Sequence, residues 1–488
     1  MLGAARAHPR IVAGLVLVTV AGGALRTQAA ATPTRYQSVD ERAYARLART
    51  LASRGHWGAN EMRDPWRWSP AAPALFAVAH RLRPAVRGDG RFDVPSAYPL
   101  QAAASTATIP AVYLLAALAA GPAAGIVAAG ALAFYPPAIA ASGELLTEPL
   151  GALGLTLALL AVALALRRPA HGACTAPVAL AAERATAAAP SPVRPAPLAL
   201  LGAGLLLGIC VVTRGDLILL PCALALVAGL VVHASGASRL RAAAAGALLV
   251  GGALVVLLPW SAFATRGAGR LVPVSTGGGS NLFVGTFLPG DGTMFGLKRE
   301  LAGEARRRFP GLRAVRPANL PQLRIIDAVA ARRPGMHRET ALRREALENL
   351  RRYALGRPLA FGAMVARKQS RLWLGVTVGS HRRPRAPVQA LHLALVACAA
   401  GGLLWGLTRR PRVGGPVLWL AAATLLYVGA VNAAFVAEAR HNLPVMPVLL
   451  AGGAAGAAGA VGALGGRLRA WRSRGRSPSV AAWPGGRR

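Results

Sequence analysis

The stretch from Tyr36 to Pro73 reads YQSVDERAYARLARTLASRGHWGANEMRDPWRWSPAAP, and it directly follows the first long apolar segment of the chain. It begins with two adjacent carboxylates, Asp40 and Glu41, in a chain that has only 18 acidic residues. The next residues repeat with the period of a helix, so that Tyr44 and several apolar side chains share one face and arginines share the other. This pattern predicts a helix that lies on a membrane surface, with its acidic start at the boundary with water.

The composition of the whole chain predicts an integral membrane protein. Of its 488 residues 54% are hydrophobic, the mean hydropathy is +0.43, and apolar runs of about the 20 residues that a bilayer crossing needs recur along it. The net charge is +38, but the cations are spread around the apolar runs and form no separate basic domain. We therefore expect membrane lipid and lipid phosphate as partners, and no nucleic acid.

The cysteines and histidines show no pattern typical of a metal site. The cysteines have no CxxC spacing, and the histidines form no HxxH or HExxH motif. No cysteine falls in a predicted external loop, so neither a disulfide framework nor structural zinc is expected. Asp40 with Glu41 could hold a divalent cation, but the residue pattern alone does not indicate a catalytic metal. The cysteines are Cys174, Cys210, Cys222 and Cys398.

We predict an all-α integral membrane fold of about ten transmembrane helices with both ends inside the cell. Arg6 and Arg10 precede the first apolar run, which favours a cytoplasmic N-terminus. A signal peptide can look similar, but an acid-bearing loop and many further spans follow, which favours a retained first span. The predicted spans cover 11–30, 97–119, 123–140, 150–166, 198–212, 217–232, 243–258, 388–407, 417–435 and 443–464.

The segments between these spans predict four regions. Residues 359–374 are apolar enough to suggest a further crossing, but Arg367, Lys368 and Arg371 favour an amphipathic surface helix instead. The four regions are an N-terminal transmembrane catalytic module at 1–264, an external mixed segment at 265–387, C-terminal transmembrane helices at 388–464 and a basic cytoplasmic tail at 465–488. The first external loop of the catalytic module (31–96) contains a second predicted surface helix at 71–82.

Polar residues collect at the external ends of the predicted spans. Any one of them could simply anchor a helix end at the interface. Their convergence on one side favours a site, because polar groups at the ends of apolar spans cost stability. The set comprises Asp40, Glu41, Glu144, Glu148, Arg214, Asp216, Arg266, Arg270, Glu438, Arg440 and His441.

These residue types suit the transfer of a sugar from a polyprenyl phosphate. The phosphate leaves without needing a proton, so one carboxylate that activates the acceptor hydroxyl is enough. A glycosidase would instead need two carboxylates spaced across the bond. Arginines are the expected partners of the phosphate, because the planar guanidinium matches its oxygens and balances the developing charge.

Several motifs resemble those of one enzyme superfamily and follow its order. The superfamily is that of the C-type glycosyltransferases that use polyprenyl-phosphate sugars, of the protein O-mannosyltransferase, aminoarabinose-transferase and dolichyl-phosphate-mannose mannosyltransferase kinds. The similar stretches are the acidic pair after the first span, SGELLTEPL (142–150), GLLLGICVVTRGDLILLP (204–221), PWSAFATRGAGRLVPVSTGGGSNLFVG (259–285) and EARHNLPVMP (438–447).

The resemblance implies roles for individual residues. Asp40 matches the catalytic acid of the family, Glu148 matches the acid of its Glu-Pro turn, and Arg214 matches the arginine of its Thr-Arg motif. Arg440 and His441 lie where the family has a Glu-x-Arg-Tyr motif, which implies contact with phosphate or acceptor.

The chain departs from the family pattern in places. Phe263 and Ala264 stand where the family has Arg-Asn, so Arg266 and Arg270 are the nearest cations for a phosphate contact. Gly215 replaces a proline. The stretch STGGGSN (275–281) lacks a Walker lysine and predicts a flexible turn, although the family places this loop near the donor.

We therefore predict a membrane enzyme that transfers a hexosyl or pentosyl group from a polyprenyl-phosphate sugar at the external face of the inner (plasma) membrane. The acceptor could be a protein, a glycolipid or a wall polymer. The alternatives are a transporter or flippase of a lipid-linked sugar and a non-catalytic assembly protein, but spans nearly free of acids favour the enzyme. The predicted catalytic residues are Asp40 and Glu41, and the predicted substrate-binding residues are Glu148, Arg214, Arg266, Arg270, Arg440 and His441.

Overall fold

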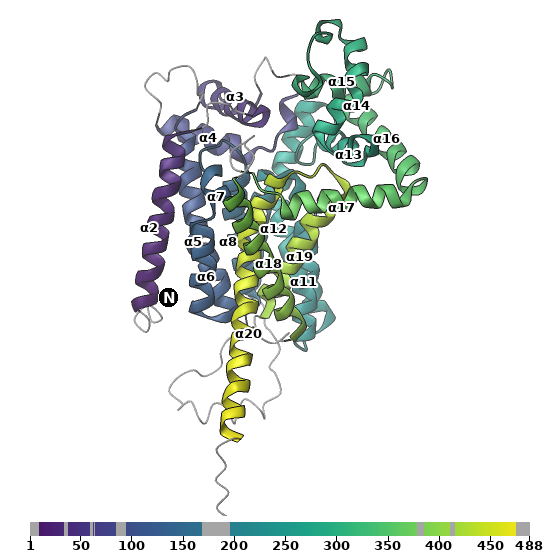
Figure 1. The fold of residues 1–488 in the computed structure, drawn as a ribbon. Coiled ribbons are helices and arrows are strands. Elements are labelled where there is room, and N and C mark those ends of the chain that lie inside the picture. The colour runs from purple at the N-terminus through teal and green to yellow at the C-terminus, as the bar shows by residue number, and fades with distance from the viewer. Residues whose placement is uncertain are drawn as a thin grey trace, which may run out of the picture.

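The computed structural model describes residues 9–33, 38–58, 62, 64–83, 94–167, 196–377, 385–409 and 415–474. In the last two ranges, side chains are described only as far as residues 408 and 463. These residues form helices, turns and loops without a strand. Long helices run side by side in a bundle, and shorter helices gather at one end of it, here called the capped end (Figure 1). Cys174, most of the predicted linker at 174–197 and the last residues of the basic tail lie outside the described ranges.

Eight helices of the described part are long and apolar enough to cross a membrane. Two shorter apolar helices bring the bundle to the predicted ten, so the all-α integral membrane fold is confirmed. The eight are α2 (Pro9–Ala31), α5 (Ala97–Ala120), α8 (Glu148–Ala165), α11 (Leu220–Ala234) together with the turn η2 (Gly215–Leu217) before it, α12 (Arg239–Ala268), α18 (Ala386–Arg409), α19 (Gly415–Ala434) and α20 (Met446–Arg474), and the shorter two are α6 (Pro122–Ala133) and α10 (Pro197–Thr213).

Small residues let the spans pack closely. Where α10 crosses α12, a Cβ added to Gly204 would overlap the carbonyl oxygen of Leu249. Where α18 meets α20, a Cβ on Gly456 would overlap the carbonyl oxygen of Gly402. Backbones that approach this closely gain van der Waals contact, which drives helix association in a bilayer.

The short helix α6 ends inside the bundle, and a buried arginine accounts for this. Arg26 of α2 is fully buried and donates hydrogen bonds of 2.9 and 2.8 Å to the carbonyls of Leu132 and Ala133. It also donates to the hydroxyl of Ser105 at 2.8 Å. Helix-end carbonyls need donors where water is excluded, and Arg26 provides them before the chain turns into α7 (Pro136–Ala141).

Two helices of the segment after α2 lie at the capped end, as predicted. They are α3 (Val39–Arg54) and α4 (Ala71–Leu82), with the short turn η1 (Pro65–Arg67) between them. Tyr44 and Phe76 are buried between them in a small hydrophobic core. Exposed arginines occupy the opposite face of α3, which confirms the amphipathic pattern.

Residues 269–377 form the rest of the cap, and they too are helical. Their core is separate from that of the bundle and centres on residues such as Phe283, Leu297 and Ile325. The element at the predicted surface helix is α17, which lies across the bundle and is not among the candidate spans (Figure 1). The helices are α13 (Gly278–Thr286), α14 (Met294–Arg308), α15 (Gln322–Ala330), α16 (Arg338–Asn349), η6 (Leu350–Leu355) and α17 (Pro358–Leu374).

Candidate active site

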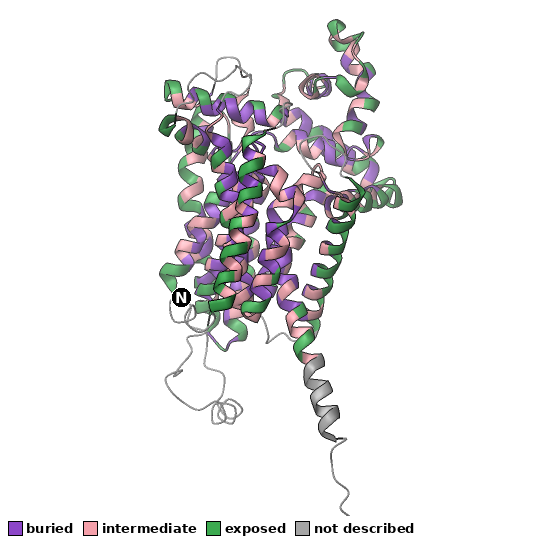
Figure 2. Ribbon diagram, turned by 60° about the vertical axis from the view of Figure 1, so that its left-hand side comes forward, coloured by how far each residue is buried: buried purple, intermediate pink, exposed green. Residues whose placement is uncertain are grey.

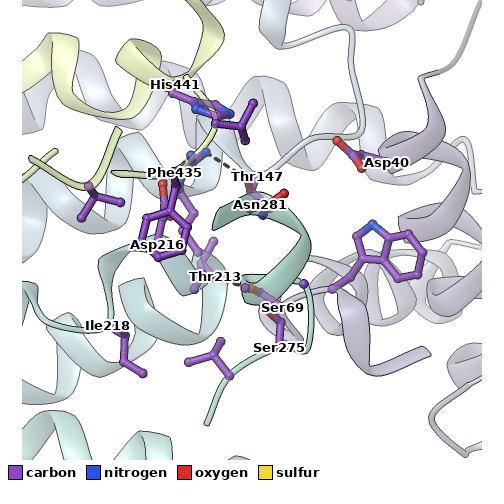
Figure 3. Close-up of a pocket in the computed structure, with 18 of the residues that line it drawn as sticks. Asp40, Ser69, Thr147, Thr213, Asp216, Ile218, Ser275, Asn281, Phe435 and His441 are labelled. Atoms are coloured by element: carbon purple, nitrogen blue, oxygen red, sulfur yellow. Dashed lines mark hydrogen bonds and ion pairs between the residues drawn. The ribbon is translucent and has the colours of Figure 1, made fainter. Parts of the chain in front are cut away.

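A cavity of about 490 Å³ lies at the capped end of the bundle. Its walls come from α3, η1, the start of α8, the turn between α10 and α11, α13, and the connection from α19 to α20. Figure 3 shows Asp40 on one side of this space, and Thr147, Asp216 and His441 across from it. The charged and imidazole side chains that line it are Asp40, Arg67, Glu148, Arg214, Asp216, Glu438, Arg440 and His441.

The start of α3 is fixed by a capping box. The hydroxyl of Ser38 accepts a hydrogen bond from the N–H of Glu41, and the Glu41 carboxylate accepts one from the N–H of Ser38 at 2.6 Å. The same carboxylate accepts from the N–H of Leu145 at 3.2 Å, which ties α3 to the turn before α8. Glu41 is buried in this role, and its neighbour Asp40 lies about 100° further round the helix, where it lines the cavity.

Asp40 is held by an arginine from the far end of the chain. The Arg440 guanidinium donates to Asp40 at 2.8 Å and to Glu438 at 2.9 Å. Burial alone would raise the pKa of Asp40, but Arg440, with Arg67 nearby, holds it below its usual value. Asp40 is therefore ionised at neutral pH and can accept a proton.

A second arginine anchors the opposite wall. Arg214 donates to both carboxylate oxygens of Asp216, at 3.3 and 3.0 Å, and to the hydroxyl of Thr147 at 3.1 Å. Glu148 lies 3.6 Å from the same guanidinium, and its other oxygen is buried without a hydrogen-bond partner among the described residues. Gly151 leaves room for this arrangement, because a Cβ there would lie 2.9 Å from Arg214.

Arg67 is a cavity residue that the sequence analysis missed. It donates to the hydroxyl of Ser280 at 3.2 Å and lies 3.8 Å from the buried Glu339. Its neighbour Trp66 packs against Trp260, which holds Arg67 at the cavity edge. The only sequence signal is the Trp-Arg-Trp run at 66–68, in which a cation lies between two aromatic residues.

The glycine-rich stretch 275–281 forms a defined wall rather than a flexible turn. The indole N–H of Trp260 donates to the carbonyl of Val274 at 2.8 Å, and the N–H of Thr276 donates to the carbonyl of Trp66 at 2.9 Å. Residues 278–281 then begin α13, and the carbonyl of Asn281 accepts from the N–H of Val436 at 3.2 Å. The stretch therefore connects η1 to the end of α19.

A backbone contact explains why Gly215 stands where the family pattern has a proline. The N–H of Gly215 donates to the hydroxyl of Ser69 at 3.1 Å, which a proline could not do. On the same side of the cavity, a ring nitrogen of His441 lies 2.9 Å from the side-chain oxygen of Asn432. These contacts join the wall around Arg214 to its neighbours on the loop after η1 and on α19.

The structure brings together five of the eight predicted site residues. Glu41 lies outside the cavity lining because its carboxylate is used by the N–H groups of Ser38 and Leu145. Arg266 is exposed at the end of α12, and Arg270 lies 3.8 Å from Asp64, so neither lines the cavity. The five that line it are Asp40, Glu148, Arg214, Arg440 and His441.

The cavity gives little support to a divalent cation held by Asp40 and Glu41. The two carboxylates point to different partners, Arg440 for the first and backbone N–H groups for the second. Within the described ranges, no group of three or more His, Cys, Asp or Glu side chains is arranged to hold a metal ion.

Comparison with solved structures identifies the fold. An oligosaccharyltransferase, AglB from Archaeoglobus fulgidus in complex with an inhibitory peptide and a dolichol-phosphate, matches with a TM-score of 0.52 and 15% identity over 96% of this chain and 52% of its own. An oligosaccharyltransferase from Archaeoglobus fulgidus in the apo form matches over the same shares with a TM-score of 0.49 and 15% identity. ArnT from Cupriavidus metallidurans bound to undecaprenyl phosphate matches with a TM-score of 0.38 and 17% identity over 92% of this chain and 78% of its own.

The chain spans about half the length of the archaeal oligosaccharyltransferase. At this identity the first match shows the fold, and it confirms that the chain has the fold of the predicted C-type superfamily. No protein-family model and no curated protein sequence matches the chain.

Proposed function

We propose that this protein is a membrane glycosyltransferase that moves a sugar from a polyprenyl phosphate to an acceptor hydroxyl. The observation that carries the proposal is the convergence of the ionised carboxylate of Asp40 and two of the guanidiniums, Arg67 and Arg440, in a cavity at the end of a membrane bundle. The matched archaeal enzyme is an oligosaccharyltransferase in complex with a dolichol-phosphate, which supports a lipid-linked donor.

Arg67 and Arg440 are the proposed phosphate ligands. Each guanidinium has five N–H groups, and the hydrogen bonds of each to described residues use fewer than half of them. Both influence the pKa of Asp40, so both lie close to the proposed base. Arginine forks suit a departing phosphate, because its negative charge increases as the bond to the sugar breaks.

Asp40 is the proposed general base. The acceptor oxygen forms a bond to the anomeric carbon, the bond from that carbon to the phosphate oxygen breaks, and the electron pair leaves with the phosphate. The proton of the acceptor hydroxyl passes to Asp40. The low pKa of Asp40 keeps it ionised before transfer, and the attacking hydroxyl becomes acidic enough to give up its proton only late in the reaction.

Glu148 is the proposed sugar ligand on the opposite wall. One of its carboxylate oxygens is buried and lacks a hydrogen bond from any described residue. A buried carboxylate oxygen without a donor costs free energy, and a sugar hydroxyl would satisfy it. Arg214 and His441 flank this position and complete the wall.

We further propose that the cavity faces the outside of the inner membrane. The helix α2 begins at the end opposite the cap (Figure 1). Arg167 follows α8, whose first residue, Glu148, lines the cavity, and Arg239 begins α12, whose other end leads into the cap. The positive-inside rule favours a cytoplasmic position for that arginine-bearing end. The experiment below identifies the transferred sugar, whether hexosyl or pentosyl. The proposed acceptor is a protein, a glycolipid or a wall polymer.

The test measures lipid-linked sugars by mass spectrometry in membranes that lack the protein, contain it, or contain Asp40→Asn at equal abundance. One polyprenyl-phosphate sugar should accumulate without the protein, fall with the wild type, and accumulate again with Asp40→Asn. Loss of the base should slow transfer by roughly 10²- to 10⁴-fold. Arg42→Gln, on the exposed face of α3, is the matched control and should behave as the wild type.

Two results would count against the proposal. Normal consumption of the donor by Asp40→Asn would remove Asp40 as the base and favour a transporter of the lipid-linked sugar. An equal loss in Glu438→Gln, which also pairs with Arg440, would mean that Asp40 acts only by holding that arginine.

A further inference from the structure

The helix α17 packs against the protein on one side only. Met364, Lys368 and Leu372 recur every four residues and are buried, and the helix contacts α19 and the short helix η7 (Ala439–Val445). Figure 1 shows it lying across the capped end, with its beginning projecting sideways beyond the bundle. Figure 2 shows exposed residues along much of the projecting part.

The first part of the face opposite this buried stripe is apolar. Leu359 is 90% exposed, and Leu355, just before the helix, is 78% exposed. Ala363 and Ala366 are exposed on the same side, because helix geometry places them well over a quarter turn from the buried stripe. A helix whose outer face meets water normally carries polar side chains there, so this face calls for a different surrounding.

Cations flank the exposed leucines. Arg351, Arg352 and Arg357 are exposed at the beginning of α17 and in η6, and none of them pairs with an acid among the residues that the structure describes. Exposed leucines bordered by arginines match the surface of a bilayer that contains anionic lipids, where acyl chains and phosphates meet. The position of α17 across the ends of the spans agrees with this depth.

We propose that the beginning of α17 is inserted in the bilayer surface, with Leu355 and Leu359 among the acyl chains and Arg351, Arg352 and Arg357 on anionic headgroups. The buried face of α17 connects this anchored helix to the cavity wall. The Lys368 ammonium donates to the carbonyls of Gly285 and Ala433 at 2.9 and 2.7 Å, at the ends of α13 and α19, which both contribute to the cavity wall.

The first experiment measures the depth of α17 in nanodiscs. The four cysteines are replaced by alanine, and a spin label is attached through Leu359→Cys or, as the matched control, through Leu347→Cys on α16, where Leu347 is 49% exposed. The label at 359 should collide mainly with oxygen, which concentrates in lipid, and the label at 347 mainly with a water-soluble nickel complex. Equal access of nickel to both positions would overturn the proposal.

The second experiment tests the arginines, with nanodiscs of phosphatidylcholine alone or with added phosphatidylglycerol. Hydrogen exchange of the 350–366 backbone in the unlabelled wild type should slow several-fold when the anionic lipid is added. The triple variant R351Q/R352Q/R357Q should lose this difference, whereas R343Q/R344Q, which removes exposed arginines of α16, should keep it. If the triple variant also kept the difference in hydrogen exchange between the two lipid compositions, the anionic-lipid assignment would be overturned. Protection that requires two copies in one nanodisc would replace the bilayer by a second copy of the chain.

Discussion

The two walls of the cavity carry the same residue types but use them differently. On one wall, Arg214 is 8% exposed and its guanidinium contacts three described side chains. On the other, Arg440 is 26% exposed and Asp40 is 38% exposed, and their pairing leaves most N–H groups of Arg440 without a described partner. We call these the closed wall and the open wall.

The difference separates fixed structure from groups that can exchange partners. A buried arginine between carboxylates is costly to disturb, because any acid left behind stays desolvated. A partly exposed ion pair contributes little to stability, so a ligand phosphate can compete for it. The closed wall should therefore respond to substitution mainly in stability, and the open wall mainly in activity.

The largest expected effect is on the closed wall. Arg214→Met would leave Glu148 buried without its cation and should lower the free energy of unfolding by about 3–5 kcal/mol. Denaturant titration of the purified protein in detergent would measure the change. The control is Arg239→Gln, at the start of α12 and outside the cavity lining. A stable Arg214→Met protein that has lost only activity would remove the distinction between the walls.

On the open wall, Arg440→Gln should reduce sugar transfer by roughly 10²- to 10³-fold, the effect of losing one preorganised donor to a developing charge. Its effect on the unfolding free energy should stay below about 1 kcal/mol, since the pair is partly exposed. Turnover of the donor identified above and denaturant titration together test this. A large loss of stability with near-normal turnover would reverse the assignment of the open wall.

Arg440→Gln should also change how kcat/KM depends on pH. In the wild type, the pKa of Asp40 lies below its usual value, so protonation of Asp40 removes activity only at strongly acidic pH. Without Arg440, burial is the main influence and raises the pKa of Asp40, so the acidic decline in kcat/KM should move to higher pH. An unchanged acidic decline would show that Asp40 is not the group that titrates.

The sequence predicts the bundle well because the length and hydropathy of each apolar run are local properties. It also predicts Asp40, Glu148 and Arg440, since polar residues at the ends of apolar spans stand out in the sequence. Arg67 could not be found in this way, because its partner Ser280 is 213 residues away and depends on how α13 folds onto η1. The orientation of Glu41 depends in the same way on the N–H of Leu145.

A smaller effect is expected where the open wall is supported from behind. Lys368→Met would leave the carbonyls of Gly285 and Ala433 without their donor, at a cost of about 1–3 kcal/mol. Burial lowers the pKa of Lys368 to about 8, with Arg371 acting in the same direction and Asp291 against it. The variant should therefore also change how stability depends on pH.

The sign of that dependence follows from proton binding. From about pH 8 to about pH 10 the folded protein has lost the Lys368 proton while the unfolded chain still holds it, so stability rises with pH relative to Lys368→Met. Melting temperatures of both proteins across this range would show the difference. A constant difference would mean that Lys368 stays charged, and its support of α13 and α19 would then rest on the ammonium at every pH tested.

The smallest expected effect separates the open wall from the arginines that the family pattern suggests. Arg266→Gln should change turnover and KM by less than about twofold, because this side chain is exposed and lies outside the cavity lining. Arg67→Gln, the equivalent change at the cavity, should raise the KM for the lipid donor strongly and lower turnover. If Arg266→Gln were the more damaging of the two, the phosphate would lie at the end of α12 rather than beside Asp40. The aromatic contact between Trp66 and Phe263 would then mark the edge of a second subsite.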